Sequence, residues 1–302
     1  MKKYFGESAL LLNTVIWGAT FALIKEALDD TSPMIFVAFR FGLAALLLFP
    51  FIYKQLFKVD KQTLIAGSIL GFFFFSGFAT QTIGLNYTTA TKSGFITGTF
   101  VVFIPILQLI IEKRKPRWFN LASILLVLVG LILLSSKGNH FLDLLDELGS
   151  DFNVGDFLTL LCAILFAFQV VYVDVFTKRH PYMPMVFIQL FITGMGGIIF
   201  ALIFSAFDIE DIKLSFSSNL IFAILYTALF ASILATVIQL KYQKVVSPTK
   251  AGIIYSFEPI MAALFAYFLL TEKISNFGVL GGLFIFIGLL FSEVLEKRNG
   301  KS

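Results

Sequence analysis

Long apolar stretches separated by short polar connectors alternate along the whole chain. A helix needs about 20 mostly apolar residues to cross the hydrocarbon core of a bilayer. The sequence contains such stretches at residues 8–28, 32–53, 63–85, 91–111 and 118–136, then at 155–177, 183–206, 218–240, 248–270 and 275–295. The pattern therefore predicts an all-α integral membrane protein with about ten transmembrane helices.

The connectors carry residues that start helices. Ser32 and Ser247 each precede a proline, which predicts an N-cap residue followed by proline in the first helical turn. The one long connector, residues 138–154, holds Phe141, Leu144 and Leu148 at helical spacing. This spacing predicts a short amphipathic helix on the membrane surface.

Basic and acidic residues occupy opposite sides of a ten-span arrangement. Since short cytoplasmic loops carry an excess of Lys and Arg, the pattern predicts that both termini are cytoplasmic. The basic connectors hold Lys54, Lys58, Lys61, Lys113, Arg114, Lys115, Arg117, Lys178, Arg179, Lys241 and Lys244, and the acidic ones hold Asp29, Asp30, Asp208, Glu210 and Asp211.

An internal repeat divides the chain into two halves. The segment Thr91–Gly94 recurs as Thr249–Gly252 at a shift of 158 positions, and the same shift aligns Gln81 with Gln239. We therefore expect a first repeat at residues 1–137, a connector at 138–154, a second repeat at 155–295 and a cytoplasmic tail at 296–302. Because five spans is an odd number, the second repeat must enter the membrane from the opposite face. Inverted repeats are typical of transporters that expose a central site to alternate sides.

Further pairs extend the alignment of the two halves. Gly6-Glu7 aligns with Gly155-Asp156, while Trp17-Gly18 aligns with Phe166-Ala167. After small gaps, Pro105 corresponds to Pro259, and Ile104 then becomes the counterpart of Glu258. The two halves are therefore expected to differ at a central site.

The order of these motifs resembles the EamA family of the drug/metabolite transporter superfamily. The likeness includes Trp17-Gly18, the Arg40 segment, Gly84–Phe95, Ser247–Gly252 and Glu258-Pro259. The resemblance covers nearly the whole chain in two copies. It implies a permease of the cell (inner) membrane, often an exporter of amino acids or other small metabolites.

Composition excludes several other classes of protein. The chain is 58% hydrophobic and 14% charged, with a mean hydropathy of +0.90, whereas soluble domains carry roughly 25% charged residues. Cys162 is the single cysteine, and the two histidines, His140 and His180, lie in connectors. We therefore expect no metal, no cofactor and no nucleic-acid partner, and a membrane-embedded enzyme is disfavoured. The expected partners are a small-molecule substrate and the lipid bilayer, with the chain acting as a monomer or a weak homodimer.

Charged residues at membrane depth invite a functional interpretation because they are costly there. Glu258 could accept a proton or bind a cationic substrate group, or it could bond to a helix that Pro259 interrupts. Lys92 and Lys250, in the first turns of their spans, could attract an anionic substrate group at opposite gates. The alternative is that these lysines reach lipid phosphates. Arg40 is assigned a structural role, as are Pro105 and Pro259.

Gln81 and Gln239 either bond across helices or bind substrate polar groups. Gly94 with Gly98, and Gly252 with Ser256, predict close packing of the fourth and ninth spans. Aromatic residues near these positions are candidates for a cavity wall, which would suit amphipathic or organic-cation cargo. They are Trp17, Phe21, Tyr87, Phe95, Tyr226, Tyr255 and Phe257.

Together these features predict an exporter of small organic metabolites, such as amino acids or amphipathic compounds, that works by alternating access. Proton coupling through Glu258 is one hypothesis. Spans 3, 4, 8 and 9, with 1 and 6, are expected to form the cavity. The alternative function is a flippase for lipids or lipid-linked substrates.

Overall fold

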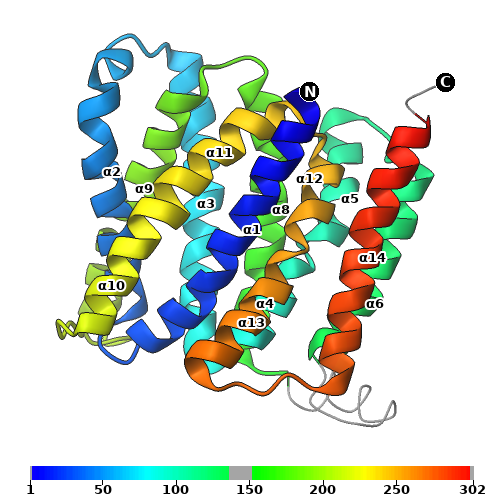
Figure 1. Cartoon of the computed structure of the whole chain (residues 1–302). Helices are drawn as coiled ribbons and strands as arrows, with labels where there is room; N and C mark the ends of the chain where they lie inside the picture. The colour runs from blue at the N-terminus through cyan, green and yellow to red at the C-terminus, as the bar shows by residue number, and fades with distance from the viewer. Residues whose placement is uncertain (1, 136–151, 300–302) are drawn as a thin grey trace.

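The computed structural model describes residues 2–135 and 152–299 as a bundle of helices that run between two faces (Figure 1). Both chain ends lie at the same face, which we call the terminal face. Within the described residues there is no β-strand, and one isolated bridge joins Thr31 to Leu214. The all-α prediction is confirmed. The surface helix expected in residues 138–154 falls largely outside the described residues.

The first repeat begins with three long helices and continues with a broken one. Its elements are α1 (Lys2–Ala27), α2 (Pro33–Leu56), α3 (Lys61–Tyr87), α4 (Ala90–Gly98), α5 (Phe100–Glu112) and α6 (Trp118–Ser135). The second repeat has the same order of spans. Its elements are α8 (Val154–Thr177), α9 (Tyr182–Ala206), α10 (Ser218–Tyr226), the π-helix η1 (Thr227–Leu234), α11 (Ala235–Tyr242), the short 3₁₀ helix η2 (Gln243–Val245), α12 (Pro248–Tyr255), α13 (Glu258–Leu270) and α14 (Asn276–Asn299).

Ten membrane segments follow from these elements. In the described part of the chain, nine helical segments have the length and apolar composition of a span, counting α4–α5, α10–η2 and α12–α13 as one each. The tenth, α6, is a shorter apolar helix over Trp118–Leu134 that packs along α14. The observed bounds lie close to those expected from hydropathy.

Equivalent helices of the two repeats pack against each other. The second spans of the repeats, α2 and α9, form one such pair, and the fifth spans, α6 and α14, form another. A Cβ atom at Gly281 would lie only 2.4 Å from the Gly130 carbonyl oxygen, so this position requires glycine where α14 crosses α6. A pseudo-twofold axis therefore runs between these two pairs, through the middle of the bundle.

The fourth and ninth spans are both interrupted, and they contact each other. The fourth breaks at Thr99, and the ninth breaks between Tyr255 and Glu258. A Cβ at Gly94 would lie 2.7 Å from Ala262 Cβ, and one at Gly98 would lie 2.6 Å from Pro259 Cγ. The predicted close packing of these spans is confirmed.

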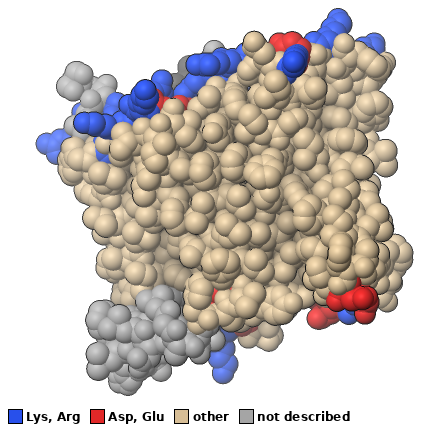
Figure 2. All heavy atoms as spheres, turned by 180° about the vertical axis from the view of Figure 1, so that it is seen from behind, with Lys and Arg blue, Asp and Glu red and all other residues tan. Residues whose placement is uncertain are grey.

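Polar groups at the helix ends follow the sequence pattern with one exception. Ser247 caps α12 by accepting a hydrogen bond from the Lys250 amide. Ser32 precedes α2, but its side chain makes no capping bond, and its amide donates to the Lys213 carbonyl instead. Figure 2 shows most of the visible Lys and Arg along the terminal face and a cluster of Asp and Glu at the opposite face.

Candidate substrate-binding site

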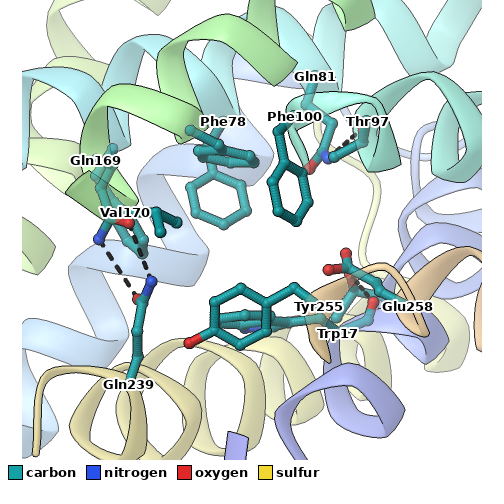
Figure 3. Close-up of a pocket in the computed structure, with 13 residues that line it drawn as sticks. Trp17, Phe78, Gln81, Thr97, Phe100, Gln169, Val170, Gln239, Tyr255 and Glu258 are labelled. Carbon is teal, nitrogen blue, oxygen red and sulfur yellow. Dashed lines mark hydrogen bonds between the residues drawn. The ribbon is translucent and has the colours of Figure 1, made fainter. Parts of the chain in front are cut away.

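A cavity of about 50 Å³ lies between the two repeats, in the middle of the bundle (Figure 3). Its wall is built by the six spans named from the sequence. A volume of this size holds only a few water molecules, so the cavity is too small for an organic solute in this conformation. The lining residues are Trp17, Thr20, Phe74, Phe78, Gln81, Thr97, Phe100, Phe166, Gln169, Val170, Gln239, Tyr255 and Glu258.

Most of the lining residues form equivalent pairs, with one member from each repeat. A shift of 149 positions relates lining residues of α1 to lining residues of α8, and a shift of 158 relates those of α3–α5 to those of α11–α13. The cavity therefore lies on the pseudo-twofold axis. The equivalent pairs are Trp17 with Phe166, Thr20 with Gln169, Gln81 with Gln239, Thr97 with Tyr255, and Phe100 with Glu258.

The structure corrects one of the repeat assignments. Glu258 begins α13 as Phe100 begins α5, and both helices have 13 residues and end before a left-handed residue, Thr271 or Lys113. Phe100 is therefore the counterpart of Glu258, and the expected match with Ile104 is wrong. The gapped alignment failed because the two prolines are not equivalent. Pro259 occupies the first turn of α13, where no amide is needed, whereas Pro105 lies inside α5.

Amide side chains occupy two parts of the wall. Gln169 and Gln239 form a reciprocal pair, in which Gln239 Nε2 donates to Gln169 Oε1 at 3.0 Å and the return bond measures 3.4 Å. Gln81 Nε2 donates to Thr97 Oγ1 at 3.1 Å. Figure 3 shows the amide pair at one end of the cavity, with Gln81 and Glu258 toward the other.

Aromatic rings separate these polar ends. Trp17 packs edge-on against Tyr255 with 5.3 Å between ring centroids, and Phe100 lies 6.4 Å from Tyr255. The indole Nε1 of Trp17 donates to the Ala231 carbonyl at 3.0 Å. Ala231 lies in η1, and the π-helix is a conformation frequent at functional sites. The π-helix η1 therefore provides the carbonyl group that orients the Trp17 ring in the cavity wall.

Glu258 is the one acidic side chain among the lining residues and is 8% exposed. Among the described residues, no cation lies within ion-pair distance of its carboxylate. A buried carboxylate without a paired cation is costly in hydrocarbon surroundings. The cavity therefore has one strong site for a proton or a positively charged group.

Two equivalent ion pairs lie toward the two faces of the bundle. Lys92 Nζ is 2.7 Å from Asp156 Oδ2, and Lys250 Nζ is 3.8 Å from Glu7 Oε1. Asp156 also accepts from the Thr88 hydroxyl at 2.8 Å. Lys250 has two closer partners on α14, Glu293 at 2.8 Å and Glu296 at 2.9 Å. Each lysine therefore faces protein carboxylates, and Lys250, which is 2% exposed, does not extend to lipid.

A family model of EamA-like transporters matches residues 4–136 and 153–293. The chain belongs to the EamA-like transporter family. It is 31% identical to an uncharacterized transporter of Archaeoglobus fulgidus over 96% of this chain and 86% of that protein. It is also 25% identical to a WAT1-related chloroplastic protein of Arabidopsis thaliana, over 97% of this chain and 72% of that protein. A solved crystal structure with 15% identity superposes with a TM-score of 0.72 over 96% of this chain and 98% of the other, which shows a shared fold.

In this EamA-like transporter, several sequence candidates lie away from the cavity. Phe21 packs against Ala262 and Ala266, and Phe95 joins the apolar cluster around α6. Tyr87 is 61% exposed at the end of α3. The Tyr226 hydroxyl donates to the Ile16 carbonyl at 3.2 Å. Phe257 packs near Phe286.

Other lining residues of the transporter escaped the sequence analysis. Thr20 and Gln169 belong to no motif. The shift of 149 positions that aligns Trp17 with Phe166 also aligns Thr20 with Gln169 and could have identified them. Phe74 and Phe78 belong to a phenylalanine-rich stretch in which no pattern separates cavity-facing rings from lipid-facing rings.

Proposed function

We propose that this transporter exports small amphipathic organic solutes that carry a cationic nitrogen, including amino acids, by alternating access. The observation that carries the proposal is the position of Glu258, a buried carboxylate in a cavity on the pseudo-twofold axis. Carboxylates and aromatic faces both attract ammonium groups. The amides of Gln81 and Gln239 add hydrogen-bonding groups for a polar substituent.

The size of the cavity supports a mechanism in which binding requires movement. Sites for drug-sized ligands measure roughly 300–1,000 Å³, well above the present 50 Å³. In this proposal the two ion pairs, Lys92 with Asp156 and Lys250 with Glu7, act as gates toward opposite faces. Breaking one while the other closes would expose the cavity to alternate sides.

Coupling to protons follows from the single carboxylate. A proton and a substrate ammonium group cannot bind the Glu258 carboxylate together, so the two ions exchange. Proton entry would then drive solute exit. This competition is the physical basis on which we assign the direction as export.

The enclosed lining supports a water-soluble solute over a lipid. Of the lining residues, Trp17 and Phe166 are half-buried and the others are buried within the bundle. A lipid headgroup would need an opening between helices toward the bilayer. The distribution of Lys and Arg supports a cell-membrane location with the terminal face in the cytoplasm.

The proposal is tested by transport in proteoliposomes with radiolabelled trimethyl(2-phenylethyl)ammonium. This permanently charged probe is not trapped by a pH gradient alone, unlike a primary amine. We expect an acidic lumen to drive its uptake by the wild type and Glu258→Gln to abolish the gradient-driven part. Glu26→Gln is the control, because Glu26 bonds to Asn219 at the end of α1, outside the cavity. Uptake that ignores both the gradient and Glu258→Gln would refute the proposal.

A further inference from the structure

Arg40 is a buried cation beside the cavity that the sequence assigned to structure. It is 1% exposed in the middle of α2, and its Nε donates to Ser232 Oγ at 2.9 Å. Its Nη2 is buried and has no hydrogen-bond partner. A guanidinium group has five donors in a planar fork, so a structural role that uses one of them leaves most of its capacity unexplained.

Arg40 and Glu258 carry opposite charges but do not form an ion pair. The other buried charges among the described residues, Asp156, Asp174 and Lys250, lie in contact with partners of opposite sign. Two opposite charges held apart in a medium of low polarity lose the attraction that would repay their desolvation. Such a separation suits a ligand that supplies both missing partners.

The Phe78 ring contacts Arg40 and also belongs to the cavity wall. The Arg40 guanidinium carbon lies 4.5 Å from the centroid of the Phe78 ring and 4.7 Å from that of Phe41. Phe78 also lines the cavity that contains Glu258. Since the cavity of about 50 Å³ is too small for an organic solute, its aromatic wall has to move on binding. Rotation of the Phe78 side chain would enlarge the cavity and expose the unpartnered Nη2 to it.

We propose that Arg40 is a second substrate-binding residue, which takes the carboxylate of a zwitterionic solute while Glu258 takes its ammonium group. This inference rests on the proposed function, because it places the ammonium group in the same cavity. Arginine suits the role since its planar fork matches a carboxylate in a bidentate contact. The solute would also need an apolar side chain to contact the aromatic wall.

The test is a binding titration on the purified full-length chain in detergent. Trp118→Phe leaves Trp17, in the cavity wall, as the single tryptophan reporter. Two matched sets serve as ligands: leucine, 3-methylbutylamine and 4-methylpentanoate, then phenylalanine, 2-phenylethylamine and 3-phenylpropanoate. We expect each amino acid to bind at least tenfold more tightly than its amine. Arg40→Gln is expected to remove this difference and leave the affinity for the amines unchanged.

Control variants separate binding from structural support. Ser232→Ala deletes the one hydrogen bond of Arg40 but leaves its guanidinium in place, so selectivity for the amino acid should persist. Arg40→Lys keeps the charge without the fork and should retain part of the selectivity. If Arg40→Gln fails to fold, Phe78→Ala provides the second measurement, because removing the ring that packs on Arg40 should open Arg40 to the cavity and raise the ratio of amino-acid to amine affinity.

The outcomes distinguish this inference from the proposed function. If amines bind, Glu258→Gln abolishes their binding and amino acids bind no more tightly, the role of Arg40 is refuted and the proposed function stands. Equal losses for amine and amino acid in Arg40→Gln, with the same losses in Ser232→Ala, would show that Arg40 is structural. If no amine or amino acid binds to the wild type, both proposals fail.

Discussion

The positions of individual charged residues in this transporter are explained by ion-pair partners from distant parts of the chain. A lysine in the first turn of a helix opposes the helix dipole, yet Lys92 and Lys250 both occupy such a position. Lys92 faces Asp156 at the start of α8, and Lys250 faces Glu7 on α1. The sequence identified the lysines as unusual, but hydropathy and spacing contain no information on which helix ends meet in space.

The two ion pairs predict different sensitivities to mutation. Asp156 is fully buried and accepts from Lys92, Thr88 and the Asn153 amide. Asp156→Asn is therefore expected to lower the free energy of unfolding by about 3 kcal/mol, as when one partner of a buried pair is removed. Glu7→Gln should cost clearly less, because Lys250 keeps two closer carboxylates on α14. Thermal unfolding in detergent measures the difference, and equal losses would contradict it.

At the scale of elements, the sequence predicted where helices begin and end better than where they break. Hydropathy located the spans because a bilayer demands a nearly fixed apolar length. The break at Thr99 has no proline beside it, and Pro105 lies inside α5 without ending it. Hydropathy also gave no sign of the π-helix η1, in which Ala231 and Ser232 bond to side chains of α1 and α2.

The contact between the two broken helices can be tested at Gly98. A Cβ there would lie 2.6 Å from Pro259 Cγ and 3.1 Å from Leu131 Cδ2. Gly98→Ala is expected to destabilise the fold by about 1–3 kcal/mol through overpacking and to reduce transport by separating α4 from α13. Gly42→Ala is the matched control, because a Cβ at Gly42 meets nothing within 4 Å. Unfolding midpoints and transport rates should separate the variants, and similar values for both would refute this packing argument.

At the scale of the whole molecule, most residues that line the cavity come in equivalent pairs from the two repeats, related by shifts of 149 or 158 positions. The repeat predicted the correct six spans, since equivalent helices must surround a common axis. It identified the unequal pair Trp17 and Phe166, but gaps placed at the prolines paired Glu258 with Ile104 instead of Phe100. The two repeats therefore differ most in charge at this pair, where the carboxylate of Glu258 is equivalent to the phenyl ring of Phe100.

The orientation of the bundle gives a direct prediction. Lys58 lies in an exposed connector at the terminal face, and Asp211 is exposed at the opposite face. With Cys162 replaced by alanine, Asp211→Cys should react with an impermeant maleimide in intact cells. Lys58→Cys should react only after the cells are permeabilised. The reverse pattern would place the termini outside.

The proposed gates, Lys92 and Lys250, lead to a prediction about access to the cavity from each side of the membrane. Thr97 lines the cavity, so Thr97→Cys in the Cys162→Ala background reports access to it through reaction with an impermeant cationic methanethiosulfonate reagent. Lys92→Gln removes the ion pair with Asp156 and should increase labelling from the face opposite the termini. Lys250→Gln removes the pairs with Glu7, Glu293 and Glu296 and should increase labelling from the terminal face. The measurement uses vesicles of both orientations, with each variant serving as the control for the other. Increased labelling from the same face in both variants would show that the two lysines are not opposite gates, because equivalent residues of inverted repeats must act on opposite sides.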